Sequence, residues 1–305
     1  MDRAYIDTVR LLLAVMPEVF RTGTFALKGG TAINLFVNDM PRLSVDIDVV
    51  YPDWRVPRDE ALRSIAEELN AIAVRLSRQG IAVRVIAAKG VGEGKLVVSS
   101  EMLLVKVEAN LIFRGTVLPV ERRPLSQHPA RMFSSGLVVP VLAIDELYGS
   151  KLVAALDRQH PRDLFDVWMM YETHGLTERM IECFVLYLAG HNRPMHEVLR
   201  PSRKDLAREF AASFAGMSRD PVELVTLEAA RRRLMSDLPQ RLSRDQRKFL
   251  ISISRNSPDW SLTNCAHASA LPAIQWRLKN LEGFRDRRPQ EWEQQVIALE
   301  SVLLG

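Results

Sequence analysis

Two aspartates separated by a single residue, Asp46 and Asp48, have the residue type and spacing best suited to chemistry in this sequence. They lie in the segment SVDIDVVY, where β-branched and polar residues alternate, a pattern typical of a strand. Residues two apart on a strand point to the same face, so both carboxylates should lie opposite Val45, Ile47 and Val49. Adjacent carboxylates repel each other unless a cation neutralises them, and oxygen ligands suit Mg²⁺ or Mn²⁺. The pair predicts a divalent metal site; the alternative is two solvated acids on an exposed strand.

A glycine pair, Gly29-Gly30, precedes these acids and predicts a second part of the same site. The apolar segment FAL before it is typical of a strand, and TAINLFV after it of a helix that begins near Thr31. A glycine turn between strand and helix allows backbone N–H groups to approach anionic oxygens. The Lys-Ser/Thr signature of a Walker A loop does not follow. We interpret the turn as a phosphate-binding segment, with an ordinary left-handed turn as the alternative.

A third acid, Glu108, lies on another predicted strand, LLVKVEANLIF, on the same face as Lys106 and Asn110. Two acids on one strand and a third on a neighbouring strand would hold the two metal ions of a nucleotidyl-transfer site. The alternative is a surface glutamate on an edge strand.

The elements that must position these residues form a mixed region followed by an all-helical region. Helices are predicted over 3–20 and 56–80, strands over 25–27, 44–51, 81–88, 95–100, 103–115 and 116–123, and helices again from residue 141 onward. We therefore predict an α+β fold, a mixed sheet with flanking helices followed by an all-helical C-terminal domain. The expected domains are 1–175 and 176–305.

Composition limits the class of protein. The 305 residues are 47% hydrophobic, which allows a large core. No apolar run approaches the roughly 20 residues that span a bilayer. The segment LLLAVMPEVF near the start is short, contains Pro17 and is followed by no cleavage pattern, so we expect no secretory signal and a cytoplasmic protein without membrane contact. Cys183 and Cys265 have no metal-ligand spacing. Residues 176–305 hold 20 Lys and Arg, 17 of them Arg, against 16 Asp and Glu. Arginines suit phosphate oxygens, which favours nucleic acid; the alternative is a set of solvated helix faces.

The segments LKGGTAINLF, RLSVDID, KVEANLIFRGT and SKLVAALDRQHPRDLFDV, which span roughly 25–170, resemble the AbiEii family of nucleotidyltransferase-like toxins, which includes the MenT toxins. That family belongs to the DNA polymerase β-type nucleotidyltransferase superfamily. The resemblance implies a toxin of a bacterial toxin–antitoxin system that transfers NMP from an NTP, expected to be a pyrimidine, to the 3′ end of tRNA and so blocks translation. It also implies a cognate antitoxin as partner and Mg²⁺ or Mn²⁺ as cofactor.

The resemblance also assigns the site residues. The expected catalytic residues are Asp46, Asp48, Glu108, Lys151, Asp163 and Asp166, and the first three are the expected metal ligands. The expected substrate-binding residues are Lys28, Gly29, Gly30, Thr31, Arg42, Ser44 and Arg162. A cleft-facing Lys151 would neutralise charge on leaving pyrophosphate, whereas the alternative is a surface lysine. Asp163 near the start of a helix has capping as its alternative role. A phosphate on Ser44 would repel the incoming triphosphate.

Two other functions stay open at this point. In the first, the chemistry is the same but the acceptor is a protein hydroxyl. In the second, the chain is a catalytically inactive binding module on a nucleotidyltransferase fold. The three acids argue against the inactive module, because a decayed site usually loses one of its acids.

Overall fold

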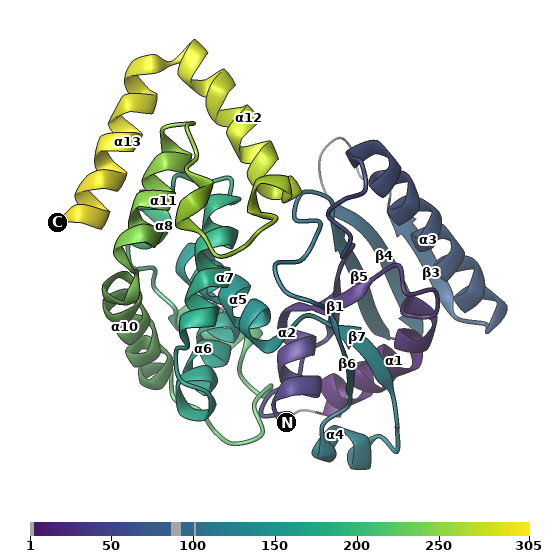
Figure 1. Ribbon diagram of the computed structural model, residues 1–305. Coiled ribbons are helices and arrows are strands. Elements are labelled where there is room, and N and C mark those ends of the chain that lie inside the picture. The colour runs from purple at the N-terminus through teal and green to yellow at the C-terminus, as the bar shows by residue number, and fades with distance from the viewer. Residues whose placement is uncertain (1–2, 87–92, 101) are drawn as a thin grey trace. The chain divides into compact units, whose positions relative to one another are not determined.

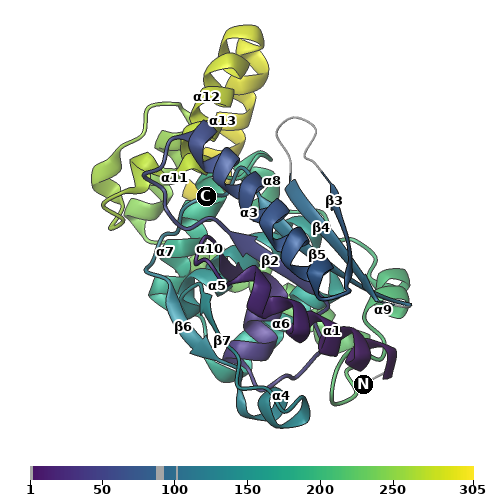
Figure 2. The ribbon, with the colours of Figure 1, turned by 90° about the vertical axis from the view of Figure 1, so that its right-hand side faces the viewer.

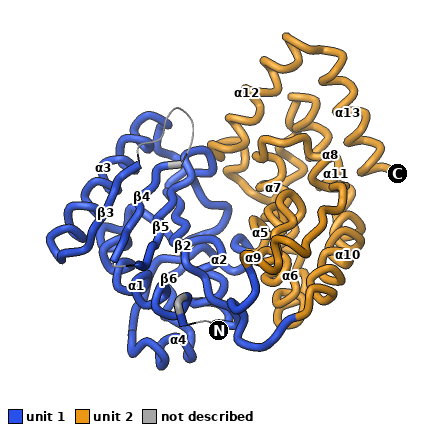
Figure 3. The backbone as a smooth tube through the Cα atoms, turned by 180° about the vertical axis from the view of Figure 1, so that it is seen from behind, with its two compact units in different colours: residues 1–147, 214–222 blue, residues 148–213, 223–305 orange. Residues whose placement is uncertain are grey.

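The computed structural model describes residues 3–86, 93–100 and 102–305 (Figure 1). The chain divides into two compact units, drawn in two colours in Figure 3. Unit 1 comprises residues 1–147 and 214–222, and unit 2 comprises residues 148–213 and 223–305. The division between Leu147 and Tyr148 differs from the expected boundary at 175/176. A Cβ added at Gly149 would lie 2.5 Å from the Cβ of Cys183, so the helix that carries Gly149 packs tightly inside unit 2.

Unit 1 is built on a seven-stranded mixed sheet with the order β3-β4-β5-β2-β1-β7-β6. Its strands are β1 (Ala26–Lys28), β2 (Asp46–Val50), β3 (Ala82–Ile86), β4 (Glu93–Ser100), β5 (Leu103–Asn110), β6 (Glu121–Pro124) and β7 (Val138–Val141). The β2–β5 and β1–β7 pairs are parallel, and the β1–β2, β3–β4, β4–β5 and β6–β7 pairs are antiparallel. The predicted mixed sheet with flanking helices is therefore confirmed.

Two helices, α1 (Arg3–Val19) and α3 (Arg58–Arg78), cover one face of this sheet, and Figure 2 shows both in front of the strands. The side chains that alternate toward them are apolar and buried, for example Leu96 of β4 and Val107 of β5. A Cβ added at Gly94 would lie 2.8 Å from Leu69 of α3, so helix and strand are in close contact there. We call the other face of the sheet the open face. It carries the remaining, alternate side chains of the strands β4, β5, β2 and β1.

The remaining helices of unit 1 are α2 (Gly29–Ala32), the π-helical turn η1 (Ile33–Val37) that continues it, and α4 (Gln127–Met132). Unit 2 is helical. Its elements are α5 (Ile144–Arg158, which begins in unit 1), α6 (Pro161–Thr173), α7 (Glu178–Ala189), α8 (Met195–Leu199), α9 (Ala207–Ser213), α10 (Leu224–Arg241), α11 (Arg244–Ser254), η2 (Trp260–Leu262), η3 (Ala268–Ala270), α12 (Pro272–Arg287) and α13 (Pro289–Leu304). The predicted helical C-terminal region is confirmed. Of the helices described, none is long and apolar enough to span a membrane.

Two strand predictions differ from the structure. The predicted strand over 116–123 begins only at Glu121, because the N–H groups of Val117 and Leu118 donate to the buried Glu146 carboxylate (2.8 and 2.9 Å) instead of a neighbouring strand. Strand β7 was not predicted. It contains Pro140, a residue that argues against a strand in sequence, and its apolar run continues directly into α5. The last two residues of the predicted strand over 81–88 lie outside the described residues.

Candidate active site

Strand β2 presents Asp46 and Asp48 on the open face as predicted. Both are partly exposed, whereas Ile47 and Val49 between and after them are fully buried under α1 and its neighbours. This alternation follows from the period of two in a strand. The buried valine and isoleucine anchor β2, and that anchoring fixes the direction of both carboxylates.

The pairing of the strands brings further charged side chains beside these acids. Residues in register have side chains on the same face, so Lys28 of β1, Asp48 of β2, Glu108 of β5 and Lys95 of β4 form one row across the open face, which we call the charged row. In the next row Asp46 is in register with Lys106. Lys95 Nζ lies 2.5 Å from Glu108 Oε1. Each of the three acids therefore has a lysine directly across from it on a neighbouring strand: Asp48 faces Lys28, Asp46 faces Lys106 and Glu108 faces Lys95.

The glycine turn lies directly against the aspartates. Gly29 has a φ of +74°, a left-handed conformation that favours glycine. A Cβ added there would lie 2.2 Å from Asp48 Oδ2, so the Gly29 backbone comes closer to this carboxylate than any other residue type would allow. The helix begins at Gly29 rather than at Thr31, because the turn leads from β1 into α2 without a loop.

The side chains of Thr31, Arg42 and Ser44 support this turn from inside. The Thr31 hydroxyl lies 2.9 Å from Ser44 Oγ and donates to the Asp46 carbonyl at 2.5 Å. Arg42 is only 2% exposed and donates to the Leu43 carbonyl at 2.9 Å. Ser44 is buried as well, so its hydroxyl faces the interior rather than the solvent. These three side chains hold the turn and the start of β2 in place.

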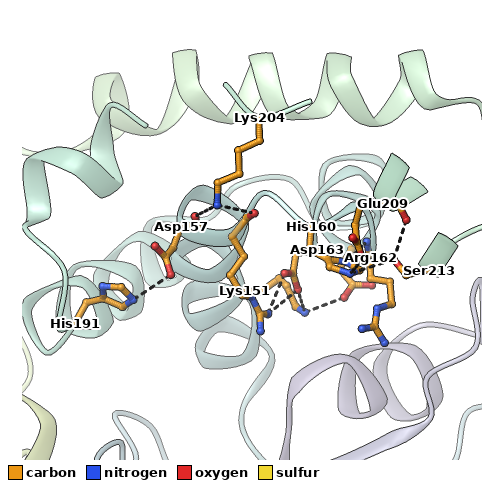
Figure 4. Close-up of polar contacts among 11 residues, drawn as sticks. Lys151, Asp157, His160, Arg162, Asp163, His191, Lys204, Glu209 and Ser213 are labelled. Atoms are coloured by element: carbon orange, nitrogen blue, oxygen red, sulfur yellow. Dashed lines mark hydrogen bonds and ion pairs between the residues drawn. The ribbon is translucent and has the colours of Figure 1, made fainter. Parts of the chain in front are cut away.

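Lys151, Asp163 and Asp166 come together in unit 2, where they form a buried ion cluster. Lys151 Nζ lies 2.8 Å from Asp163 Oδ1 and 3.0 Å from Asp166 Oδ2, and the three side chains are 7%, 4% and 1% exposed. Arg158 also contacts Asp163, at 2.9 Å. Figure 4 shows Lys151 pointing to Asp163 from α5. The capping that was the alternative role for Asp163 is carried out by another residue.

That capping residue is His160, whose Nδ1 accepts a hydrogen bond from the Arg162 backbone N–H at 3.1 Å. Its Nε2 lies 3.1 Å from Glu209 Oε1 and 3.2 Å from Ser213 Oγ. Burial, together with the nearby Arg162 charge, lowers the pKa of His160 below its usual value. The Arg162 side chain itself is half-buried.

The arginines of α10 differ from one another. Arg231 is 6% exposed and donates to Gln159 Oε1 and the Lys204 carbonyl, so not every arginine of this region is available to phosphate. Arg233 lies 4.0 Å over the Tyr171 ring and also pairs with Asp237. Arg232, between them, is exposed. The sequence alone cannot tell which of three consecutive arginines is buried and which is exposed, because this depends on how the helix packs against its neighbours.

The acidic side chains on the open face offer carboxylate oxygens, which suit a hard divalent cation. Among the residues that the structure describes, however, no group of three or more His, Cys, Asp or Glu side chains is arranged to hold a metal ion. Asp46 and Asp48 remain a fitting pair, since Mg²⁺ is commonly bound through one or two carboxylates plus substrate phosphates. Sequence reasoning missed Lys95, and the only signal for it was its place in the alternating segment KLVVSS.

Comparisons with known proteins identify the family and the fold of this chain. A family model described as "Nucleotidyl transferase AbiEii toxin, Type IV TA system" matches residues 10–280. Among solved structures the chain is similar to MenT4, a nucleotidyltransferase toxin from Mycobacterium tuberculosis H37Rv, with a TM-score of 0.63 and 21% identity. The likeness covers 92% of this chain and 95% of that chain, and it shows the fold. No curated protein matches the chain.

Proposed function

The chain belongs to the family of AbiEii nucleotidyl transferase toxins of type IV toxin–antitoxin systems, and from that premise we propose that it transfers NMP from an NTP to the 3′ end of tRNA. The nucleotide is a pyrimidine, and the product blocks translation. The family implies an NTP as substrate and an antitoxin as partner. We place the protein in the cytoplasm, where tRNA is available.

The observation that carries the proposal is the aspartate pair beneath the glycine turn. Asp46 and Asp48 share the open face of β2, and the Gly29 backbone lies against the Asp48 carboxylate. Two carboxylates beside a close backbone turn suit a triphosphate that arrives with a divalent cation. Lys28 and Lys106 flank the acids in register and add positive charge for phosphate oxygens.

In the proposed reaction the acceptor hydroxyl oxygen attacks the α-phosphorus of the NTP. The bond from the α-phosphorus to the bridging oxygen breaks, pyrophosphate leaves, and the hydroxyl proton passes to solvent. Asp46 and Asp48 would hold a Mg²⁺ or Mn²⁺ ion, which would neutralise triphosphate charge and make the α-phosphorus more electrophilic. Gly29 and Gly30 would give the phosphates close access to the backbone.

The other predicted site residues take supporting roles in this proposal. Thr31, Arg42 and Ser44 fix the turn and β2 through the buried contacts described above. Glu108 is the third predicted metal ligand, and its ion pair with Lys95 would compete with a metal ion for its carboxylate. Lys151, with Arg162, is proposed to act on the triphosphate and the leaving pyrophosphate, and a Lys151 variant tests that role separately.

The exposed arginines of unit 2 support a nucleic-acid acceptor. Members of this set are exposed on the loop before α9, on α9 itself, and on α10 and α11: Arg200, Arg203, Arg208, Arg232 and Arg244. Guanidinium groups bind phosphate oxygens in a fork geometry. An RNA backbone offers many such oxygens, whereas a protein hydroxyl offers none.

The test is incubation of the purified chain with total tRNA, Mg²⁺ and each labelled NTP in turn, followed by a denaturing gel. We expect label on tRNA with a pyrimidine nucleotide and none with the Asp48→Asn variant. Removing one of two adjacent acids relieves repulsion, so this variant should keep its circular dichroism spectrum. Label on protein instead of RNA would favour the protein-hydroxyl acceptor, and no label with any NTP would favour the inactive binding module.

A further inference from the structure

We propose that Lys95 is the built-in counter-cation of Glu108, so that this site takes one divalent cation, on Asp46 and Asp48, instead of two. The inference rests on the proposed function, because it concerns the metal requirement of that same site. It assigns Lys95 as a positioning residue that acts through Glu108.

The first observation is the contact itself. Lys95 and Glu108 are in register on the antiparallel strands β4 and β5, and Lys95 Nζ lies 2.5 Å from Glu108 Oε1. The side chains are 28% and 22% exposed, so solvent screens this pair less than a surface pair. Both strands lie inside the sheet, with β3 and β2 as their outer neighbours, which fixes the backbone positions of the two residues.

The second observation is the distance to a hypothetical second ion. Mg²⁺ binds carboxylate oxygens at about 2.0–2.1 Å, so an ion on Glu108 Oε1 would have the Lys95 ammonium within about 5 Å. The two positive charges would repel each other at this separation. A second ion would therefore have to displace Lys95 before it could bind.

The third observation is the charge balance along the charged row. Two acids, Asp48 and Glu108, stand between two lysines, Lys28 and Lys95, so the row is neutral without any metal. A site that held two divalent ions would need an excess of carboxylates to offset them.

These observations give Lys95 a definite task. It supplies, as a fixed part of the chain, one positive charge where a second ion would otherwise bind, and it keeps Glu108 directed along the row. The single ion then enters on Asp46 and Asp48 together with the triphosphate.

The experiment counts Mn²⁺ ions bound per chain from the electron paramagnetic resonance signal of free Mn²⁺, with Mn²⁺ alone as the probe. The variants are Lys95→Met, Glu108→Gln and the double variant of both. Lys248→Met is the control, because it removes an exposed lysine of α11, outside the charged row, and leaves Lys95 against Glu108. Circular dichroism checks the fold of each.

We expect Lys95→Met to bind one more Mn²⁺ per chain than the wild type, with at least a tenfold lower Kd for that ion. The double variant should lose the extra ion, Glu108→Gln alone should bind as many ions as the wild type, and Lys248→Met should gain none. The inference is overturned if Lys95→Met gains no ion, or if Glu108→Gln binds one fewer than the wild type. The second comparison decides the matter even if Lys95→Met does not fold.

The Mn²⁺ count does not depend on nucleotide transfer, so the two proposals fail separately. If the wild type labels tRNA but the Glu108→Gln variant binds one Mn²⁺ fewer than the wild type, the counter-cation role of Lys95 is refuted and the proposed transferase function stands. A wild type with the expected counts but no transfer to any acceptor would refute the proposed function alone.

Discussion

Replacing Lys151 with methionine should destabilise unit 2 by about 3–5 kcal/mol, the usual cost of removing one partner from a buried ion pair. The value follows from burial: Asp163 and Asp166 are 4% and 1% exposed and lie 2.8 and 3.0 Å from the ammonium. Without Lys151 these carboxylates are left close together and away from water. Arg158 offsets little of this, because it is 61% exposed and its charge is screened.

The assay is thermal unfolding followed by circular dichroism. At roughly 2–4 °C per kcal/mol for domains of this size, the Tm of the transition that reports on unit 2 should fall by about 10 °C. The triple variant Lys151→Met/Asp163→Asn/Asp166→Asn should recover most of the loss, because no buried charge remains. Lys204→Met is the control: its Nζ donates only long 3.2 Å bonds to the Asp157 and Arg158 carbonyls at the surface (Figure 4), and its Tm should change by less than 2 °C.

A Tm loss below 2 °C for Lys151→Met would refute the buried cluster. The same variant tests the proposed catalytic role when it is assayed at a temperature where it is still folded. Loss of one electrostatic donor costs about 10²–10³ in rate. A folded variant that transfers nucleotide within threefold of the wild type would confine Lys151 to a structural role.

Three further outcomes are expected. Gly29→Ala should abolish transfer, because the new Cβ would lie 2.2 Å from a carboxylate oxygen of the site. Gly80→Ala, at a similar φ of +77° but with no atom within 4 Å, should lower the free energy of unfolding by only about 1–2 kcal/mol and leave transfer unchanged. Equal transfer rates in both variants would contradict the close approach. Burial lowers the pKa of His160 below its value of about 6.5 in the unfolded chain, so the unfolded state binds more protons as the pH falls, and the stability present above pH 6.5 should fall as the pH drops through the folded pKa. The urea midpoint at pH 7.5 and at pH 5.5 measures this change, and His160→Gln should reduce the difference between the two midpoints. A higher midpoint at pH 5.5 would contradict it. Arg232→Glu should weaken tRNA binding and reduce its salt dependence in a filter-binding assay, without a change in Tm. Arg231→Met should instead lower the Tm, because that side chain is buried. Equal Tm values for the two variants would contradict this difference in their roles.

Local patterns predicted the parts of the site that depend on neighbours in sequence. The alternation of SVDIDVVY placed Asp46 and Asp48 on one face, and the buried Ile47 and Val49 agree with it. The glycine pair predicted a strand–turn–helix segment at the correct place, although the helix begins two residues earlier than expected. These features depend on the period of a strand and the conformational range of glycine, and both are properties of a few consecutive residues.

Long-range pairings decided what the sequence left open. Glu108 was predicted on a strand beside the one with the two aspartates, but its distance from Lys95 depends on the register of β4 against β5. Alternation does not fix that register, because a shift of two residues leaves every side chain on the same face. The burial of Arg231 and of Ser44 likewise depends on which elements pack over them.

The sequence by itself determined the strand with two carboxylates, the glycine turn, the family resemblance and the mixed sheet followed by helices. The tertiary structure alone decided that Lys95 lies against Glu108 and that Lys151 lies between two buried aspartates. The reason is that backbone period and turn chemistry are local, whereas an ion pair joins residues whose separation is fixed by strand register and helix packing across the whole unit.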